Sequence, residues 1–86
     1  MSKPARTLEK ILGGRADTNI PFRDLRTLLK HLEFAERIKG DHFIFSKDGI
    51  EEILNLQPKG SKGKPYQVKQ VRQVILKYHL GESNDE

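Results

Sequence analysis

The sequence predicts a single small α+β domain in which a helix, three antiparallel strands and a second helix follow one another. Two segments with helical spacing of apolar residues flank a stretch of alternating apolar and polar residues. A length of 86 residues suits one domain with a modest core. Because such a sheet has one face to bury, both helices are expected to pack on that face and to leave the other open.

A weaker helical segment precedes this domain. Residues 7–12 have helical spacing and end at a pair of glycines, which is a typical helix stop. We therefore divide the chain into an N-terminal extension at 1–19, a domain at 20–81 and a disordered acidic tail at 82–86. The extension is expected to be either dispensable or in contact with a partner.

The two helices of the domain are both predicted to be amphipathic. Proline favours the first turn of a helix, and Pro21 and Pro65 stand at the two expected starts. Gly81 suits the end of the second helix. The apolar stripes comprise Phe22, Leu25, Leu28, Leu29 and Leu32 on the first helix, and Val68, Val71, Val74, Ile75 and Tyr78 on the second.

Three strands are expected between the helices, at residues 33–39, 42–47 and 50–56. Side chains alternate between the two faces of a strand, so the phenylalanines of the second strand should face the core and His42 should stand on the open face. The Asp48-Gly49 pair favours a tight type I′ turn between the second and third strands, because both central residues of that turn need positive φ.

The basic residues are concentrated late in the chain. The formal net charge is +4, and residues 53–81 contain no acidic residue. An exposed imidazole beside a basic surface suits the binding of a polyanion such as RNA. The basic side chains of this segment are Lys59, Lys62, Lys64, Lys69, Arg72 and Lys77.

Several functional classes are disfavoured by composition. The chain has no cysteine, so disulfides and thiolate metal sites are excluded, and its three histidines lack the spacing of a metal site. The glycines at 60 and 63 lack the spacing of a phosphate-binding loop. We therefore expect no cofactor. Apolar runs of at most three residues predict no membrane span, and a cytoplasmic location is expected.

The run Gly40-Asp41-His42-Phe43-Ile44-Phe45 resembles the Gly-Ser-His-His-x-Phe motif of the HicA toxins of bacterial toxin–antitoxin pairs. A basic Pro/Gly loop before a last helix rich in Lys, Arg and Val is similar too, and the resemblance covers about residues 21–80. It implies a double-stranded-RNA-binding-like fold and an endoribonuclease that cleaves mRNA, an mRNA interferase. It also implies neutralisation by a HicB-type antitoxin protein, with His42 as the catalytic residue.

Two residues depart from the family motif. Asp41 stands in place of the serine and Phe43 in place of the second histidine. An aromatic ring suits a strand position that faces the core. A carboxylate beside His42, in contrast, favours imidazolium and repels phosphate, so we expect it to weaken activity or to move its pH dependence.

The expected chemistry is RNA cleavage without metal. The neutral imidazole of His42 takes the proton of a 2′-hydroxyl group, whose oxygen attacks the adjacent phosphate. Water or a lysine would serve as the acid, because His31 and His79 lie elsewhere and are assigned no role. Tyr66 could stack on a base, but a tyrosine at the start of a helix more often packs against the sheet, so it is interpreted as packing there and is not counted as a site residue. The cations expected to bind RNA and to stabilise the transition state are Lys39, Lys47, Lys59, Lys62 and Lys64.

Two further functions stay open. The first is a non-catalytic RNA-binding module, in which the lysines bind phosphates and His42 only donates or accepts a hydrogen bond. The second is a protein whose basic face serves mainly to bind an acidic partner.

Overall fold

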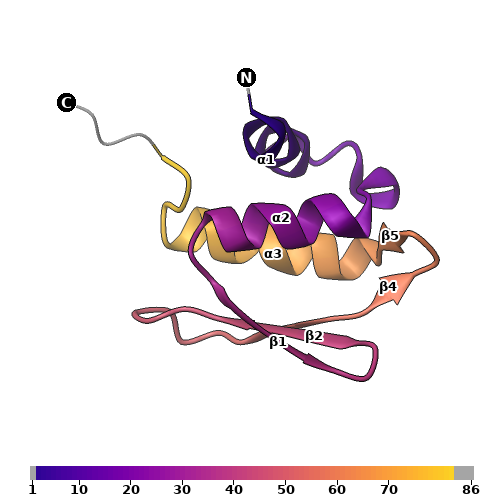
Figure 1. Cartoon of the computed structure of the whole chain (residues 1–86). Helices are drawn as coiled ribbons and strands as arrows, with labels where there is room; N and C mark the ends of the chain where they lie inside the picture. Colours follow the sequence, from indigo (N-terminus) through magenta and orange to yellow (C-terminus); the bar gives the residue numbers. More distant parts are fainter. Residues whose placement is uncertain (1, 83–86) are drawn as a thin grey trace.

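The computed structural model describes residues 2–82 and has an α+β fold (Figure 1). The predicted order of helix, three strands and helix is confirmed. The central elements are α2 (Phe22–His31), β1 (Ala35–Lys39), β2 (His42–Ser46), β3 (Leu54–Leu56) and α3 (Pro65–Lys77). The additional elements are α1 (Lys3–Gly13), the short 3₁₀ helix η1 (Asp17–Asn19), β4 (Pro58–Lys59) and β5 (Lys62–Gly63).

The elements form three layers (Figure 1). Strands β1, β2 and β3 make an antiparallel sheet in that order, and α2 and α3 lie together on one face of it, as predicted. Helix α1 lies on the other side of the helix pair. Of the predicted acidic tail at 82–86, only Glu82 belongs to the described residues, and its carboxylate is 2.9 Å from His79 Nδ1.

The core lies between the sheet and the helix pair. Phe45 in the middle of the sheet is fully buried, and its cross-strand neighbour Leu54 is buried beside it. Leu25 of α2 and Val71 of α3 are fully buried and belong to the same apolar cluster. Since Phe45 faces the helices, strand alternation places the side chain of His42 on the open face of the sheet.

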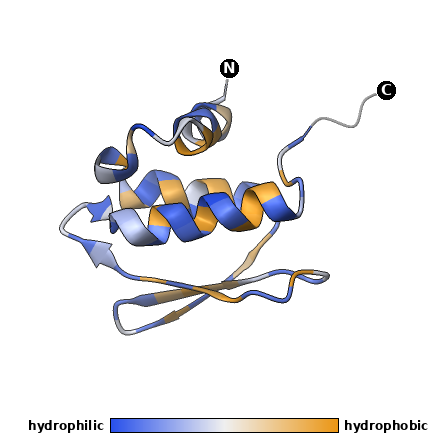
Figure 2. Ribbon diagram, turned by 180° about the vertical axis from the view of Figure 1, so that it is seen from behind, coloured by the Kyte–Doolittle hydropathy of each residue, from blue (hydrophilic) through white to orange (hydrophobic). Residues whose placement is uncertain are grey.

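The N-terminal extension belongs to this core. Ile11 of α1 is fully buried, and the apolar side of α1 faces the helix pair (Figure 2). The end of the helix is held as well, because the Arg72 guanidinium of α3 donates to the Ile11 carbonyl at 3.1 Å and pairs with Asp17 at 2.9 Å. Helix α1 is therefore the third layer of the domain, which argues against the expectation that the extension is dispensable.

The predicted hairpin turn at Asp48-Gly49 differs from the structure. A turn is present, closed by a 3.1 Å bond from Ile50 N to the Lys47 carbonyl, but only Gly49 has positive φ, and β3 begins as late as Leu54. The intervening chain is drawn toward the end of α3 instead of pairing with β2. There Glu52 accepts hydrogen bonds from Lys77 at 2.8 Å and from the Tyr78 hydroxyl at 2.7 Å, which lower the pKa of Glu52 to about 2.

The tight hairpin of the sheet lies at Gly40-Asp41, between β1 and β2. Lys39 and His42 are paired across it, and Gly40 has φ 62° while Asp41 does not have positive φ. Positive φ at the first loop residue alone matches a type II′ turn. This turn places His42 at the first position of β2.

The basic Pro/Gly loop that the sequence predicts before the last helix forms a hairpin at residues 58–63. Strands β4 and β5 pair, and their hairpin is bound to the start of α2 by Phe22 N to the Ser61 carbonyl at 2.8 Å and Gly63 N to the Ile20 carbonyl at 2.9 Å. A Cβ atom on Gly63 would lie 3.1 Å from a methyl group of Leu25. Glycine at this position therefore permits the close packing of the hairpin on α2.

Candidate functional site

His42 lies on the open face of the sheet with half of its side chain exposed. Its cross-strand partner on β1 is Lys39, and directly paired residues of an antiparallel sheet project from the same face. Arg37 and Ile44 form the next pair along that face. The imidazole is thus accessible and has cationic neighbours on β1.

A hydrogen bond from β3 sets the orientation of the imidazole. His42 Nδ1 lies 3.1 Å from Oδ1 of Asn55. An amide oxygen only accepts hydrogen bonds, so Nδ1 carries the proton and Nε2 of the neutral ring keeps its lone pair. The nitrogen able to accept a proton therefore faces away from Asn55.

Asp41 is held beside this nitrogen by a chain of polar contacts. Its Oδ1 is 3.8 Å from His42 Nε2, beyond hydrogen-bond distance, while its Oδ2 accepts from Gln57 Nε2 at 2.7 Å. Gln57 Oε1 in turn accepts from Lys64 at 2.9 Å. The hydrogen bond from Gln57 is the main cause that lowers the pKa of the Asp41 carboxyl, which is therefore ionised at neutral pH.

A groove of about 360 Å³ begins at His42 and continues to the start of α3. It is lined by His42, Ile53, Asn55, Gln57, Tyr66, Gln67 and Gln70. Tyr66 is 59% exposed, so the expectation that its ring packs against the sheet is wrong. The start of α3 therefore contributes a side of the candidate site.

Gln67 positions α3 against the edge of the sheet. Its buried side chain accepts from Gln57 N at 3.0 Å and donates to the Asn55 carbonyl at 3.4 Å. Gln57 N and the Asn55 carbonyl are backbone groups that a fourth strand beside β3 would bind. The side-chain amide of Gln67 therefore takes the place of one residue of such a strand. The contact holds the groove together.

The five lysines expected at the site are not all gathered there. Lys39 is paired with His42, and Lys64 reaches it through Gln57 and Asp41. Lys59 is exposed on β4, and Lys62 binds the side chain of Asn19 in η1.

Lys47 directly follows the end of β2 that is opposite His42, about 16 Å away along an extended chain. It faces Glu33 at 3.8 Å. The structure therefore brings Lys39 and Lys64 to His42, leaves Lys59 and Lys62 paired with each other on the β4–β5 hairpin, and sets Lys47 apart from His42.

The segment at residues 53–81 contains no acidic residue, but acidic side chains from other parts of the chain pair with two of its cations. Arg72 pairs with Asp17 from the N-terminal extension, and Lys77 pairs with Glu52 from the chain before β3. Two of its cations are therefore neutralised by other parts of the fold.

The residues of the candidate site that the sequence analysis did not assign to it are uncharged. Asn55 lies 13 residues from its partner His42, and no local pattern connects the two. Tyr66 and Gln70 are four residues apart on α3, a spacing that places both on one side of a helix. That spacing was the only available signal, and it is common in helices of every function.

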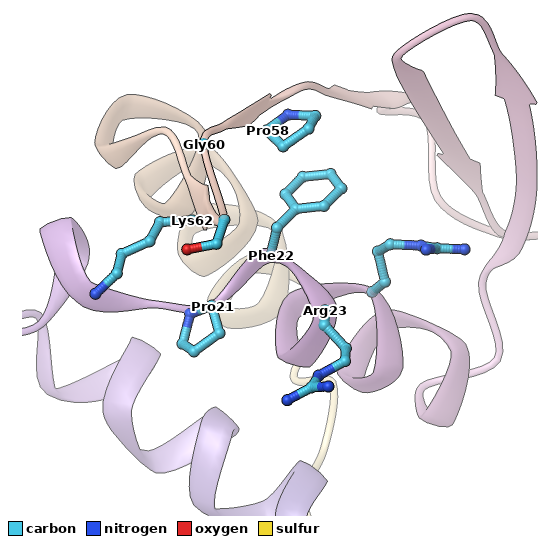
Figure 3. Close-up of a pocket in the computed structure, with 8 residues that line it drawn as sticks. Pro21, Phe22, Arg23, Pro58, Gly60 and Lys62 are labelled. Atoms are coloured by element: carbon cyan, nitrogen blue, oxygen red, sulfur yellow. The ribbon is translucent and has the colours of Figure 1, made fainter.

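A larger pocket of about 560 Å³ lies at the start of α2, between that helix and the β4–β5 hairpin. Figure 3 shows the ring of Phe22 next to Pro58, while the head groups of Arg23 and Lys62 point away from these rings. A binding site requires polar groups that converge on its ligand. We therefore place the candidate site at His42.

A scan against protein-family models and searches of curated proteins and of solved structures each gave no match. Across residues 2–82, no helix has the length and apolar character needed to cross a bilayer. Nor do three or more His, Cys, Asp or Glu side chains of that part of the chain come together as metal ligands.

Proposed function

We propose that this protein is the toxin ribonuclease of a bacterial toxin–antitoxin pair and that it cleaves single-stranded mRNA without a metal ion. The observation that carries the proposal is the exposed imidazole of His42, whose Nδ1 is bound by Asn55 at 3.1 Å so that Nε2 is free to accept a proton. The motif around His42, which resembles that of the HicA toxins, agrees with this role.

The proposed reaction begins with transfer of the 2′-hydroxyl proton to His42 Nε2. The 2′-oxygen attacks the adjacent phosphorus, a bond from the 2′-oxygen to phosphorus forms, and the bond to the 5′-oxygen of the next nucleotide breaks. Lys39 and Lys64 stabilise the additional negative charge at phosphorus, and water or a lysine protonates the leaving oxygen. DNA lacks the 2′-hydroxyl and is not cleaved by this route.

A non-catalytic RNA-binding module is the second candidate function, and Asp41 is the observation that favours it. Its ionised carboxylate lies 3.8 Å from His42 Nε2 and repels a phosphate approaching that nitrogen. In the ribonuclease proposal, Gln57 and Lys64 offset the charge of Asp41. Gln57 donates a hydrogen bond to the Asp41 carboxylate, and Lys64 donates one to Gln57.

Cleavage of end-labelled single-stranded RNA in the presence of EDTA separates the two functions. We expect discrete fragments in EDTA at neutral pH, because the proposed proton acceptor is an imidazole. A DNA oligonucleotide of the same sequence is the control and should stay intact. RNA that is bound but never cut would establish the binding module instead, and cleavage only with added Mg²⁺ would contradict the mechanism.

The salt dependence of RNA binding tests which lysines contact phosphate. Lys39 and Lys59 are exposed and form no ion pair within residues 2–82. Each of Lys39→Gln and Lys59→Gln should lower the slope of log affinity against log salt by about 0.7, the value for one phosphate contact on a single strand. Lys47→Gln is the matched control and should leave the slope unchanged. If Lys39→Gln and Lys59→Gln both keep the slope of the parent protein, neither lysine contacts a phosphate of the RNA.

We also propose a HicB-type antitoxin as the protein partner and the cytoplasm as the location. A mainly acidic antitoxin that covers the open face of the sheet would block access to His42 directly. Charge complementarity with Lys39 and Arg37 on that face would speed association.

A further inference from the structure

We propose that the groove beside His42 is a pocket for one unpaired RNA base, in which Tyr66 is the stacking platform and the Gln70 amide contacts the edge of the base. The inference rests on the proposed function and deepens it, because it assigns a residue pair that determines which sequences are bound at the site.

Tyr66 has the properties of a stacking platform. It is more than half exposed although it belongs to the first turn of α3, and it lines the groove together with His42. Its hydroxyl oxygen accepts a hydrogen bond from Gln67 Nε2 at 3.3 Å, and Gln67 is itself buried against β3. The ring is therefore held at its hydroxyl end while its surface stays open. Aromatic rings in this situation stack on unpaired bases.

Some polar side chains of the groove are already hydrogen-bonded within the protein, and others are free to bind a ligand. Gln57 uses its side-chain amide on Asp41 and Lys64, and Gln67 uses its own on β3 and Tyr66. Gln70, in contrast, makes no side-chain hydrogen bond within residues 2–82. The Nδ2 group of Asn55 is likewise free, because its bond to His42 uses the oxygen.

These free groups suit a base better than a phosphate. A primary amide offers one acceptor and two donors, the combination that matches the neighbouring donor and acceptor on the edge of a base. No cationic side chain lines the groove apart from the ionisable ring of His42. The edges and faces of bases are accessible in single strands, so the occupant is an unpaired base of single-stranded RNA.

The position of the pocket relates the base to the cleaved bond. His42 lines the same groove as Tyr66 and Gln70. A base bound there belongs to the nucleotide whose 2′-hydroxyl group meets His42 or to its immediate neighbour. The pocket would thus give the enzyme a base preference next to the cleavage position.

Binding of short RNAs to the His42→Ala variant tests the pocket without cleavage. The probes are one single-stranded oligonucleotide and a set of copies in which one nucleotide at a time lacks its base. Loss of the base at one position should weaken binding about fivefold or more, the effect of one stacked base. Adding Tyr66→Ala should weaken binding of the intact RNA by a similar factor and abolish the difference between intact and abasic probes. Tyr66→Phe should keep that difference.

Gln70→Ala tests the contact to the edge of the base. It should reduce the differences in affinity among the four bases at that position and leave the abasic probe unaffected. Gln73→Ala is the matched control, because it is an exposed glutamine of the same helix that does not line this groove. The proposal is overturned if Tyr66→Ala binds every probe as the parent does, or if it weakens intact and abasic probes equally.

These binding experiments test the base pocket separately from the proposed ribonuclease activity. Position-specific base dependence in a protein that cuts no RNA would support the pocket and refute the ribonuclease. Cleavage by a protein that shows no such dependence would refute the pocket alone.

Discussion

Replacement of His42 by alanine is expected to reduce RNA cleavage by about 10²- to 10⁴-fold, the usual contribution of a general base. The reason is that the proposed site contains one group able to accept the 2′-hydroxyl proton, the Nε2 atom left free by the bond to Asn55. The measurement is the rate of cleavage of labelled RNA in EDTA under single-turnover conditions, which reports the chemical step.

The fold of the His42→Ala variant should be unchanged. Half of the side chain is exposed, so little apolar area is lost, and the change in unfolding free energy should stay within about 0.5 kcal/mol. His31→Ala is the matched control, because it also replaces an exposed histidine, at the end of α2. A His42→Ala variant that cuts at the parental rate would show that the nuclease activity, if present, uses other residues.

Replacement of Ile11 by alanine is expected to lower the free energy of unfolding by about 2–5 kcal/mol. Ile11 belongs to the predicted extension, yet its side chain is fully buried between α1 and the helix pair. A loss of this size is a large part of the roughly 5–15 kcal/mol that stabilises a small domain. Urea unfolding followed by circular dichroism measures it.

Leu12→Ala provides the control for that experiment. Leu12 is the next residue of α1 and is 42% exposed, so its truncation should cost clearly less than that of Ile11. Equal and small losses in the two variants would mean that the buried contact of Ile11 adds little stability and that α1 is dispensable for folding.

The order of the elements was predictable because it depends on local periodicity. The apolar stripe at Leu25, Leu28 and Leu29 repeats with the helical period, and all three residues are buried. The alternation of β2 placed Phe45 in the core and His42 on the open face in the same way. Such patterns are read within about ten residues and need no knowledge of the neighbours.

The connection before β3 shows why other features were not predictable. Asp48-Gly49 has the composition of a tight hairpin turn, and a turn forms there. The strand nevertheless starts at Leu54, because Glu52 is bound by Tyr78 and Lys77 from the far end of α3. A contact across 25 or 26 residues overrides the local preference, and nothing in the turn itself indicates it.

By itself the sequence determined that this chain forms a helix, three strands and a helix, that His42 begins the second strand, and that basic residues follow it. Only the tertiary structure decided which groups meet His42. Asn55 sets its tautomer, Asp41 lies beside its free nitrogen, and Tyr66 stands at the other side of the groove. The physical reason is that periodicity reports which face of an element is buried, whereas a site depends on distances between elements that only packing establishes.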